Sequence, residues 1–160
     1  GSFQGANRRT YAIISTNNIV CNNADVHGAH GGLAVDDGVC TVVGGTYVSD
    51  EYYGLYVSND ADDNTDPDEA DILILGGTFT GKTYSVWIGS DVKSPVNSVI
   101  RIKGGDFTNP LKMQKNVAPD AGIVEYPEDE YDLIENTDGS RELRKKVTVI
   151  DGDGDIDDDI

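Results

Sequence analysis

Long hydrophobic runs are missing from this sequence of 160 residues. No apolar run approaches the ~20 residues that a bilayer-spanning helix needs, so membrane insertion is not expected. No basic segment followed by an apolar one opens the chain, as it would in a secretory signal. The opening Gly1-Ser2 is typical of a cloning remnant, so the missing signal excludes nothing, and we expect further domains in a longer parent chain.

Basic residues are also scarce, with 12 Lys and Arg against 29 Asp and Glu, for a net charge of −17. A field of this sign repels nucleic acid phosphates and anionic membrane surfaces, so neither is an expected partner. The charge suits an extracellular or cell-surface protein. Cysteine occurs only at Cys21 and Cys40.

Glycine, by contrast, is abundant, with 19 residues, and part of it recurs in a pattern. The stretches "VVGGTYVS", "ILGGTFTG" and "IKGGDFTN" each follow a short apolar run, and their Gly-Gly pairs begin at Gly44, Gly76 and Gly104. A fourth, degenerate copy has Asn23-Ala24 in place of the glycines. The pairs begin 32 and 28 residues apart, and repeats of that length with variable loops indicate stacked coils. We therefore expect an all-β protein, a right-handed parallel β-helix (solenoid) of about four coils.

Aligning the copies gives columns of similar side chains, as a parallel stack requires. The expected inward columns are Ile19, Cys40, Ile72 and Ile100; Cys21, Val42, Ile74 and Ile102; Ala12, Leu33, Leu55 and Val86; Ile14, Val35, Val57 and Ile88; and Val26, Tyr47, Phe79 and Phe107. The alternative is an antiparallel β-sandwich, which does not require the same ladder in successive units. The alignment puts the two cysteines in adjacent coils but in different columns, about 8 Å apart between Cα atoms. That is beyond the reach of a disulfide, so we expect two buried thiols.

Gly-Gly-Thr-Phe and Gly-Gly-Thr-Tyr corners with short Val/Ile strands, over residues 10–110, resemble the right-handed parallel β-helix proteins of the pectate-lyase-like superfamily. They look in particular like repeat regions of large secreted or surface-anchored bacterial proteins. The superfamily contains lyases, hydrolases, phage tailspikes and non-catalytic adhesins, so the resemblance implies an architecture only. Its lyases hold calcium with clustered carboxylates beside an Arg or Lys base. Arg101 and Lys103 face outward, but the aligned Thr41 and Leu73 supply no carboxylate, so we assign no catalytic residue.

The segments outside the repeat suggest a division of the chain. Residues 1–9 are expected to be the cloning remnant and a lead-in, residues 10–110 the coils, and residues 111–150 a capping segment. Within the cap, residues 131–146 predict a β-hairpin with its turn at Thr137-Asp138-Gly139. Residues 151–160 are interpreted as an acidic linker or a truncated calcium loop.

Two acidic stretches contain candidate calcium ligands, because carboxylate oxygens suit this ion. The first supplies Asp60, Asp62 and Asp63, and the second supplies Asp151, Asp153 and Asp155. A solvated loop and a linker are the alternatives, and these are favoured. His27 and His30 lie in a glycine-rich stretch and lack an obvious third ligand, so we interpret them as turn residues rather than a metal site.

The outward column Ile13, Ala34, Tyr56 and Trp87 places two large aromatic rings on adjacent coils. Tyr56 and Trp87 are candidates for a platform on which sugar rings stack. The alternative is a small satellite core covered by the tail or by residues 58–71. We therefore expect a non-enzymatic surface or secreted module, a stalk or adhesin that binds carbohydrate or a host protein. A fragment of a polysaccharide-degrading enzyme or a tailspike, with its catalytic residues elsewhere, and a pure spacer are the alternatives.

Overall fold

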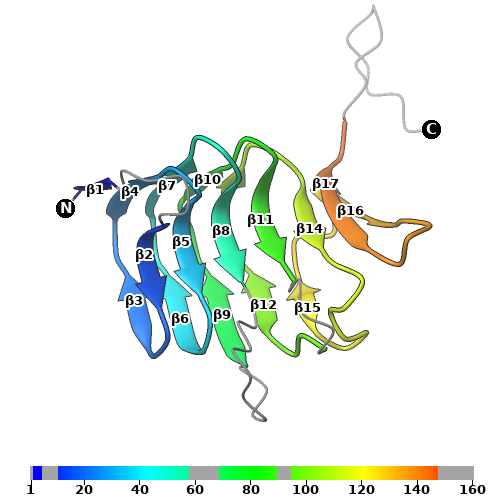
Figure 1. Cartoon of the computed structure of the whole chain (residues 1–160). Helices are drawn as coiled ribbons and strands as arrows, with labels where there is room; N and C mark the ends of the chain where they lie inside the picture. Colours follow the sequence, from blue (N-terminus) through cyan, green and yellow to red (C-terminus); the bar gives the residue numbers. More distant parts are fainter. Residues whose placement is uncertain (1, 5–10, 58–68, 90–94, 148–160) are drawn as a thin grey trace, which may run out of the picture.

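The computed structural model of the chain describes residues 2–4, 11–57, 69–89 and 95–147. These residues form strands β1 to β17, and none of them is helical. No helix among them has the length and hydropathy needed to cross a membrane. Figure 1 shows the strands side by side along the molecule, with the N-terminal strands at one end and β16 and β17 at the other.

Three sheets are built from every third strand of the chain. Sheet A contains, in spatial order, β1 (Ser2–Gln4), β4 (Ala24–Gly28), β7 (Gly45–Ser49), β10 (Thr78–Thr80) and β13 (Asp106–Phe107). Sheet B contains β2 (Tyr11–Ser15), β5 (Gly31–Val35), β8 (Tyr53–Val57), β11 (Tyr84–Ile88), β14 (Leu111–Met113), β17 (Arg141–Lys145) and β16 (Tyr131–Glu135). Sheet C contains β3 (Ile19–Cys21), β6 (Gly38–Val42), β9 (Ala70–Ile74), β12 (Val99–Ile102) and β15 (Gly122–Glu125).

Strands β1 to β15 pair with one another only in parallel, and the chain visits the three sheets in rotation. The predicted all-β class and parallel sheets are therefore confirmed, and the arrangement is compatible with a parallel β-helix. The alternative antiparallel sandwich is wrong for these strands. Antiparallel pairing occurs where β17 joins β14 and β16. These last two strands form a hairpin across residues 131–145, at the position that the Thr137-Asp138-Gly139 turn predicts.

The interior follows the predicted columns in sheets A and C. Cys40 pairs with Ile19 and Ile72, and Tyr47 pairs with Val26 and Phe79. The aromatic members stack on one another: Tyr47 on Phe79 with ring centroids 4.8 Å apart, and Phe79 on Phe107 at 5.2 Å. One continuous buried cluster results, and it runs through all three sheets.

The Gly-Gly corners need glycine for two different reasons. The second glycine of each pair has a positive φ, 109° at Gly45, 102° at Gly77 and 103° at Gly105, which is costly for a residue with a Cβ. At the first position the space is closed, because a Cβ on Gly76 would lie 2.7 Å from the carbonyl oxygen of the preceding copy. In the degenerate corner the left-handed conformation falls on Asn23, with φ 54°. Asparagine tolerates that conformation better than most residues.

The first copy of sheet B is out of the predicted register by one residue. Ile13, not Ala12, pairs with Leu33, and Ile14 is 59% exposed instead of pointing into the core. Ser15 takes the buried position beside Val35. The cause is the connection between β2 and β3: Ser15 pairs with Val35 and Ile19 with Cys40, so this connection is one residue shorter than the one between β5 and β6. The prediction extended the register of β3 and β6 back through that connection and so placed β2 one residue out.

Parallel pairing extends beyond the predicted coils in both directions. Residues 2–4, expected to be lead-in, pair as β1 with β4. Residues 111–125, expected to belong to the cap, contain β14 and β15, which extend sheets B and C in parallel. Leu111 pairs with Val86 and Ile123 with Ile100, so the inward columns continue although the Gly-Gly signal does not. Each sheet therefore contains five mutually parallel strands, one more than the four copies visible in the sequence.

Candidate functional site

Tyr56 and Trp87, the two predicted platform residues, lie next to each other on the outer face of sheet B. They occupy paired positions on β8 and β11. Leu55 and Val86, one position before them, are fully buried, whereas both rings are only half-buried. The two side chains are therefore outside the core, as the alignment expects, and their role in binding stays a prediction.

Stacking on this face involves two rings that the sequence did not single out. Trp87 stacks on Tyr53, with ring centroids 4.8 Å apart and planes inclined by 19°. Tyr53 stacks on Tyr56 at 5.7 Å, and Tyr56 stacks on Tyr11 of β2 at 5.4 Å. These four rings form a continuous line across sheet B, and we call this line the aromatic row.

Strand β5 contributes no ring to the row, although it lies between β2 and β8. Gly31 of β5 is paired with Tyr11 on one side and Tyr53 on the other, and a Cβ on it would collide with the Tyr11 ring. Ala34 points outward but is only 2% exposed. The small residues of β5 therefore allow rings from the two neighbouring strands to meet above it.

Tyr53 and Tyr56 face the same side because the alternation of β8 breaks between them. Gly54 and Leu55 are consecutive and both buried, and the ladder with β11 passes over Gly54. A Cβ on Gly54 would lie 2.9 Å from two backbone atoms, so this position is closed to larger side chains. Two successive inward residues put the flanking tyrosines on one face. Strict alternation would have placed Tyr53 in the core.

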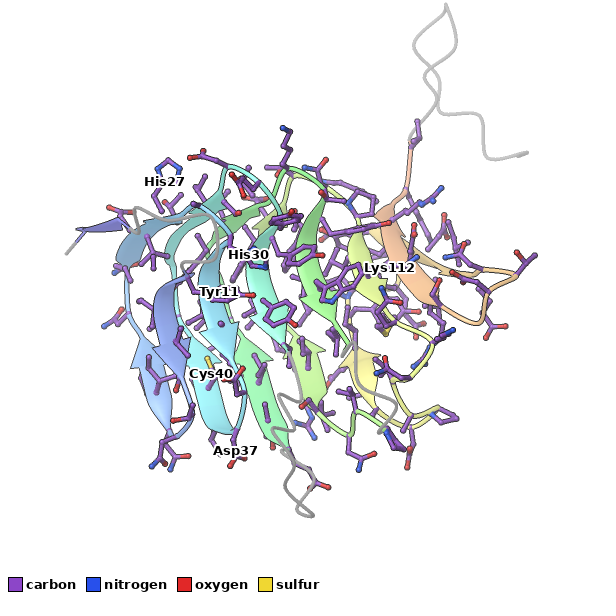
Figure 2. All side chains as sticks on the ribbon, viewed as in Figure 1. Tyr11, His27, His30, Asp37, Cys40 and Lys112 are labelled. Atoms are coloured by element: carbon purple, nitrogen blue, oxygen red, sulfur yellow. The ribbon has the colours of Figure 1, made fainter. Side chains whose placement is uncertain are left out.

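One flank of the row is formed by the turn before β5 and the residues before β8. The His30 ring lies 4.4 Å from the Tyr52 ring and 5.1 Å, edge-on, from the Tyr11 ring, centroid to centroid. Ser49 fixes this flank, because its Oγ donates to the His30 carbonyl oxygen at 2.9 Å and accepts from the Tyr52 backbone N–H at 3.0 Å. Figure 2 shows Tyr11 and His30 on the face of sheet B that is turned to the viewer.

The other end of the row meets a group of charged residues. Tyr84 lies 5.7 Å from Trp87, ring to ring, and Lys112 Nζ lies 5.7 Å from the centre of the Tyr84 ring. Lys112 Nζ also donates to Glu142 Oε1 at 3.0 Å, and Arg144 donates to Glu142 Oε2 through Nε and Nη2 at 2.9 and 2.8 Å. The hairpin strand β17 is thus joined to the aromatic face by ionic contacts.

Glu142 is the centre of this charged group, and its side chain is only 6% exposed. Burial disfavours the ionised carboxylate, but hydrogen bonds from Lys112 and Arg144 outweigh it and hold the pKa of Glu142 below its usual value. Lys112 is nearly as buried, with 11% of its side chain exposed. Both cations therefore direct their donors to one carboxylate, and the three side chains together carry a net charge of +1.

The two histidines lie in different surroundings. His27 lies on β4, with Nε2 2.8 Å from Asp50 Oδ1, whereas His30 packs among the aromatic rings. Within the described ranges, no group of three or more His, Cys, Asp and Glu side chains could hold a metal ion. The candidate calcium ligands Asp60, Asp62, Asp63, Asp151, Asp153 and Asp155 all lie outside the described residues, so calcium binding stays a prediction.

Arg101 and Lys103, the cations of sheet C, are each paired with a carboxylate. Arg101 NH1 lies 2.6 Å from Asp71 Oδ1, and Lys103 Nζ contacts Glu125. The alignment of the copies predicts no carboxylate beside Arg101, because the aligned positions are Thr41 and Leu73. Asp71 instead reaches it from two residues before Leu73 on β9. All four side chains are about half-exposed, which makes these surface salt bridges.

Cys21 and Cys40 are free thiols in the core, as predicted. The Cys40 thiol hydrogen-bonds to Cys21 and lowers the pKa of Cys21 to about 7, against the opposing effect of burial. The same contact, together with burial, raises the pKa of Cys40. Both side chains are almost fully enclosed, so the pair lies inside the stack and outside the candidate site.

The chain matches no protein-family model, no curated protein and no solved structure. The chemistry of the aromatic row must therefore be derived from its geometry. Near-parallel rings with centroids 4.8–5.7 Å apart are offset, so each overlaps only part of its neighbour. The half-buried rings of the row combine an apolar surface with the polar groups of tyrosine and tryptophan.

Proposed function

We propose that this chain is a parallel β-helix module of a secreted or cell-surface protein, and that it binds carbohydrate on the aromatic row. The observation that carries the proposal is the continuous line from Tyr11 through Tyr56 and Tyr53 to Trp87, half-buried on the outer face of a sheet. The module acts by binding and not by catalysis.

The chemistry of the row suits a sugar. Pyranose rings have an apolar C–H face and a rim of hydroxyl groups, and tyrosine and tryptophan combine an apolar ring with a polar group. Rings also give a large contact area at a low cost in conformational entropy. The row is held in place by neighbouring strands, so the rings are ordered before a ligand arrives, which lowers the cost of binding.

The architecture supports a role in displaying loops of variable length. In a stack of parallel strands each turn contacts mainly its neighbours, so loops can vary without disturbing the core. The chain uses this freedom between β5 and β6, where the link is short, and between β8 and β9, where it is long. A net charge of −17 keeps such a module solvated and suits an extracellular or cell-surface location.

A glycan array probed with the wild-type chain and with Trp87→Ala tests the proposal. We expect selective binding by the wild type and at least a tenfold loss of affinity for Trp87→Ala. The substitution removes the ring that stacks on Tyr53 and contacts the ligand. Leu75→Ala, on the outer face of sheet C, is the matched control and should bind as the wild type does. Thermal melts of all three chains show whether the fold is retained.

Three results would contradict the proposal. Equal binding by Trp87→Ala and the wild type would separate the row from recognition. Release of sugar products from any bound polysaccharide would show turnover and favour the enzyme alternative. Binding to a cell-surface protein, with no binding to any glycan, would show that the ligand is a protein and not a carbohydrate.

A further inference from the structure

We infer that the aromatic row binds an internal stretch of a neutral, linear polysaccharide that lies across the strands of sheet B. This inference rests on the proposed function and specifies its ligand. It follows from the direction of the row, from its length and from the charges at its end.

The row runs across the strands. Tyr11 is on β2, Tyr53 and Tyr56 are on β8, and Trp87 is on β11, with β5 lying between β2 and β8. Three strand spacings of about 4.8 Å separate β2 from β11, which gives a row of roughly 14 Å. A single sugar covers one ring, whereas an extended oligosaccharide of about three units covers the whole line. The length of the row therefore favours a chain over a monosaccharide.

The Trp87 end of the row does not favour a chain terminus. At the Trp87 end the next paired residue is Lys112, whose ammonium group is directed to Glu142. Arg144 donates to the same carboxylate through two nitrogens. Recognition of a terminal sugar usually needs polar groups that converge on it, and here they converge on one another. A sugar chain can thus continue past the Trp87 end of the row.

The charge of the site favours a neutral ligand. Glu142 engages both cations at the Trp87 end, and Glu51 lies beside Tyr52 on the opposite flank. The chain as a whole carries −17, so a uronic acid polymer would approach against repulsion. A neutral chain avoids that repulsion, and its binding should depend little on salt.

Calorimetric titration of the full chain with oligosaccharides of one to six units tests the inference. The neutral probes are β-1,4-linked gluco-, xylo- and manno-oligosaccharides, and the anionic probes are oligogalacturonates of equal length. For at least one neutral series we expect affinity to rise at least tenfold from one to three units and then level off. Raising the salt concentration from 50 to 500 mM shortens the Debye length roughly threefold. This change should alter the affinity for the neutral series less than twofold.

Variants at the two ends of the row give a readout that loss of folding would not. Tyr11→Ala should reduce the affinity for four-unit chains to that for two-unit chains and leave two-unit chains unaffected. Trp87→Phe, which keeps a ring, should retain most of the binding that Trp87→Ala loses. Val20→Ala, on the outer face of sheet C, is the control for both.

The possible failures are distinguishable. Tightest binding to a monosaccharide, or to oligogalacturonates with an affinity that depends on salt, would overturn this inference and leave carbohydrate binding in place. Equal effects of Tyr11→Ala on chains of two and four units would overturn the placement of the chain along the row. Failure of every sugar to bind, with the fold intact, would overturn both this inference and the proposed function.

Discussion

The outer faces of sheets B and C are built by the same turns of the chain, yet they carry different side chains. On sheet B, rings from β2, β8 and β11 contact one another across the strands. On sheet C, exposed aliphatic side chains such as Val20 and Leu75 lie on β3 and just after β9, and two surface salt bridges join Asp71 to Arg101 and Lys103 to Glu125. Both faces follow one inward pattern, so the difference is confined to the outward positions.

The comparison shows which positions the stack constrains. Inward side chains touch their counterparts above and below, so the columns stay uniform from copy to copy, as Tyr47, Phe79 and Phe107 do. Outward positions meet solvent and are free to vary, as the mixed series Thr41, Leu73 and Arg101 shows. A continuous line of stacked rings on such a face is therefore a departure from the background. That departure makes sheet B, and not sheet C, the candidate binding face.

The largest expected effect comes from breaking the interior that both faces share. Phe79→Ala removes a fully buried ring that stacks on both sides, and large-to-small changes of this kind cost about 3–5 kcal/mol. We expect the free energy of unfolding to fall by that amount in chemical denaturation and sugar binding to weaken with it. Phe79→Leu should cost less than half as much. Equal stability of Phe79→Ala and the wild type would show that the column does not support the fold.

The next effect separates the charged end of sheet B from the exposed salt bridges of sheet C. Glu142→Gln leaves the buried Lys112 without its counter-charge, which should cost roughly 2–3 kcal/mol, less than the 3–5 kcal/mol of a fully buried pair. Asp71→Asn breaks an exposed pair and should cost under about 1 kcal/mol. Urea denaturation at neutral pH measures both changes. Similar costs for the two variants would contradict the distinction between the buried ion pair of sheet B and the exposed one of sheet C.

The same carboxyl group predicts a dependence on pH. The folded state lowers the pKa of Glu142, so its contribution to stability is fully present above the usual value of 4.5 and is lost as the pH falls through the lowered folded value. The stability difference between the wild type and Glu142→Gln should therefore shrink as the pH falls below 4.5. Thermal melts from pH 7 to pH 3 measure it, and a difference that stays constant would contradict the prediction.

Much of this fold can be predicted from the sequence because its repeat is local. The Gly-Gly corners mark each turn, and the inward columns of sheets A and C follow from counting residues to the next corner. The count fails where a loop changes length, as before Ile19, and where the corner is absent, as at residues 111–125. In both cases the packing continues although the signal that reveals it does not.

The candidate site was only half visible in the sequence. Tyr56 and Trp87 stand in an outward column, which period-two alternation identifies. Tyr53 was missed because buried Gly54 breaks that alternation, and Tyr11 was missed because its contact with Tyr56 crosses a whole strand. The small residues of β5 were the available signal. Glycine and alanine between two aromatic-rich strands indicate that rings can meet above them.

Gly31→Ala tests this role of β5 directly. The new Cβ should displace the Tyr11 ring and separate it from Tyr56. Stability should change by no more than about 1 kcal/mol, because the lower conformational entropy of the unfolded chain opposes the local strain. We expect an altered near-ultraviolet circular dichroism spectrum and weaker binding of four-unit glycans. In a Tyr11→Ala background the substitution should have no further effect on either measurement. An additive effect there would show that Gly31 acts through other contacts.

The smallest effects are expected on the outer face of sheet C. Val20 is 68% exposed and Leu75 46%, so Val20→Ala and Leu75→Ala should each change the free energy of unfolding by no more than about 0.5 kcal/mol and leave sugar binding intact. Denaturation at two protein concentrations makes the test sharper. A cost above 1 kcal/mol that grows with protein concentration would mean that these side chains are covered in solution by a second copy of the chain. Sheet C would then be a contact surface in its own right, and the contrast between the two faces would lie in what they bind.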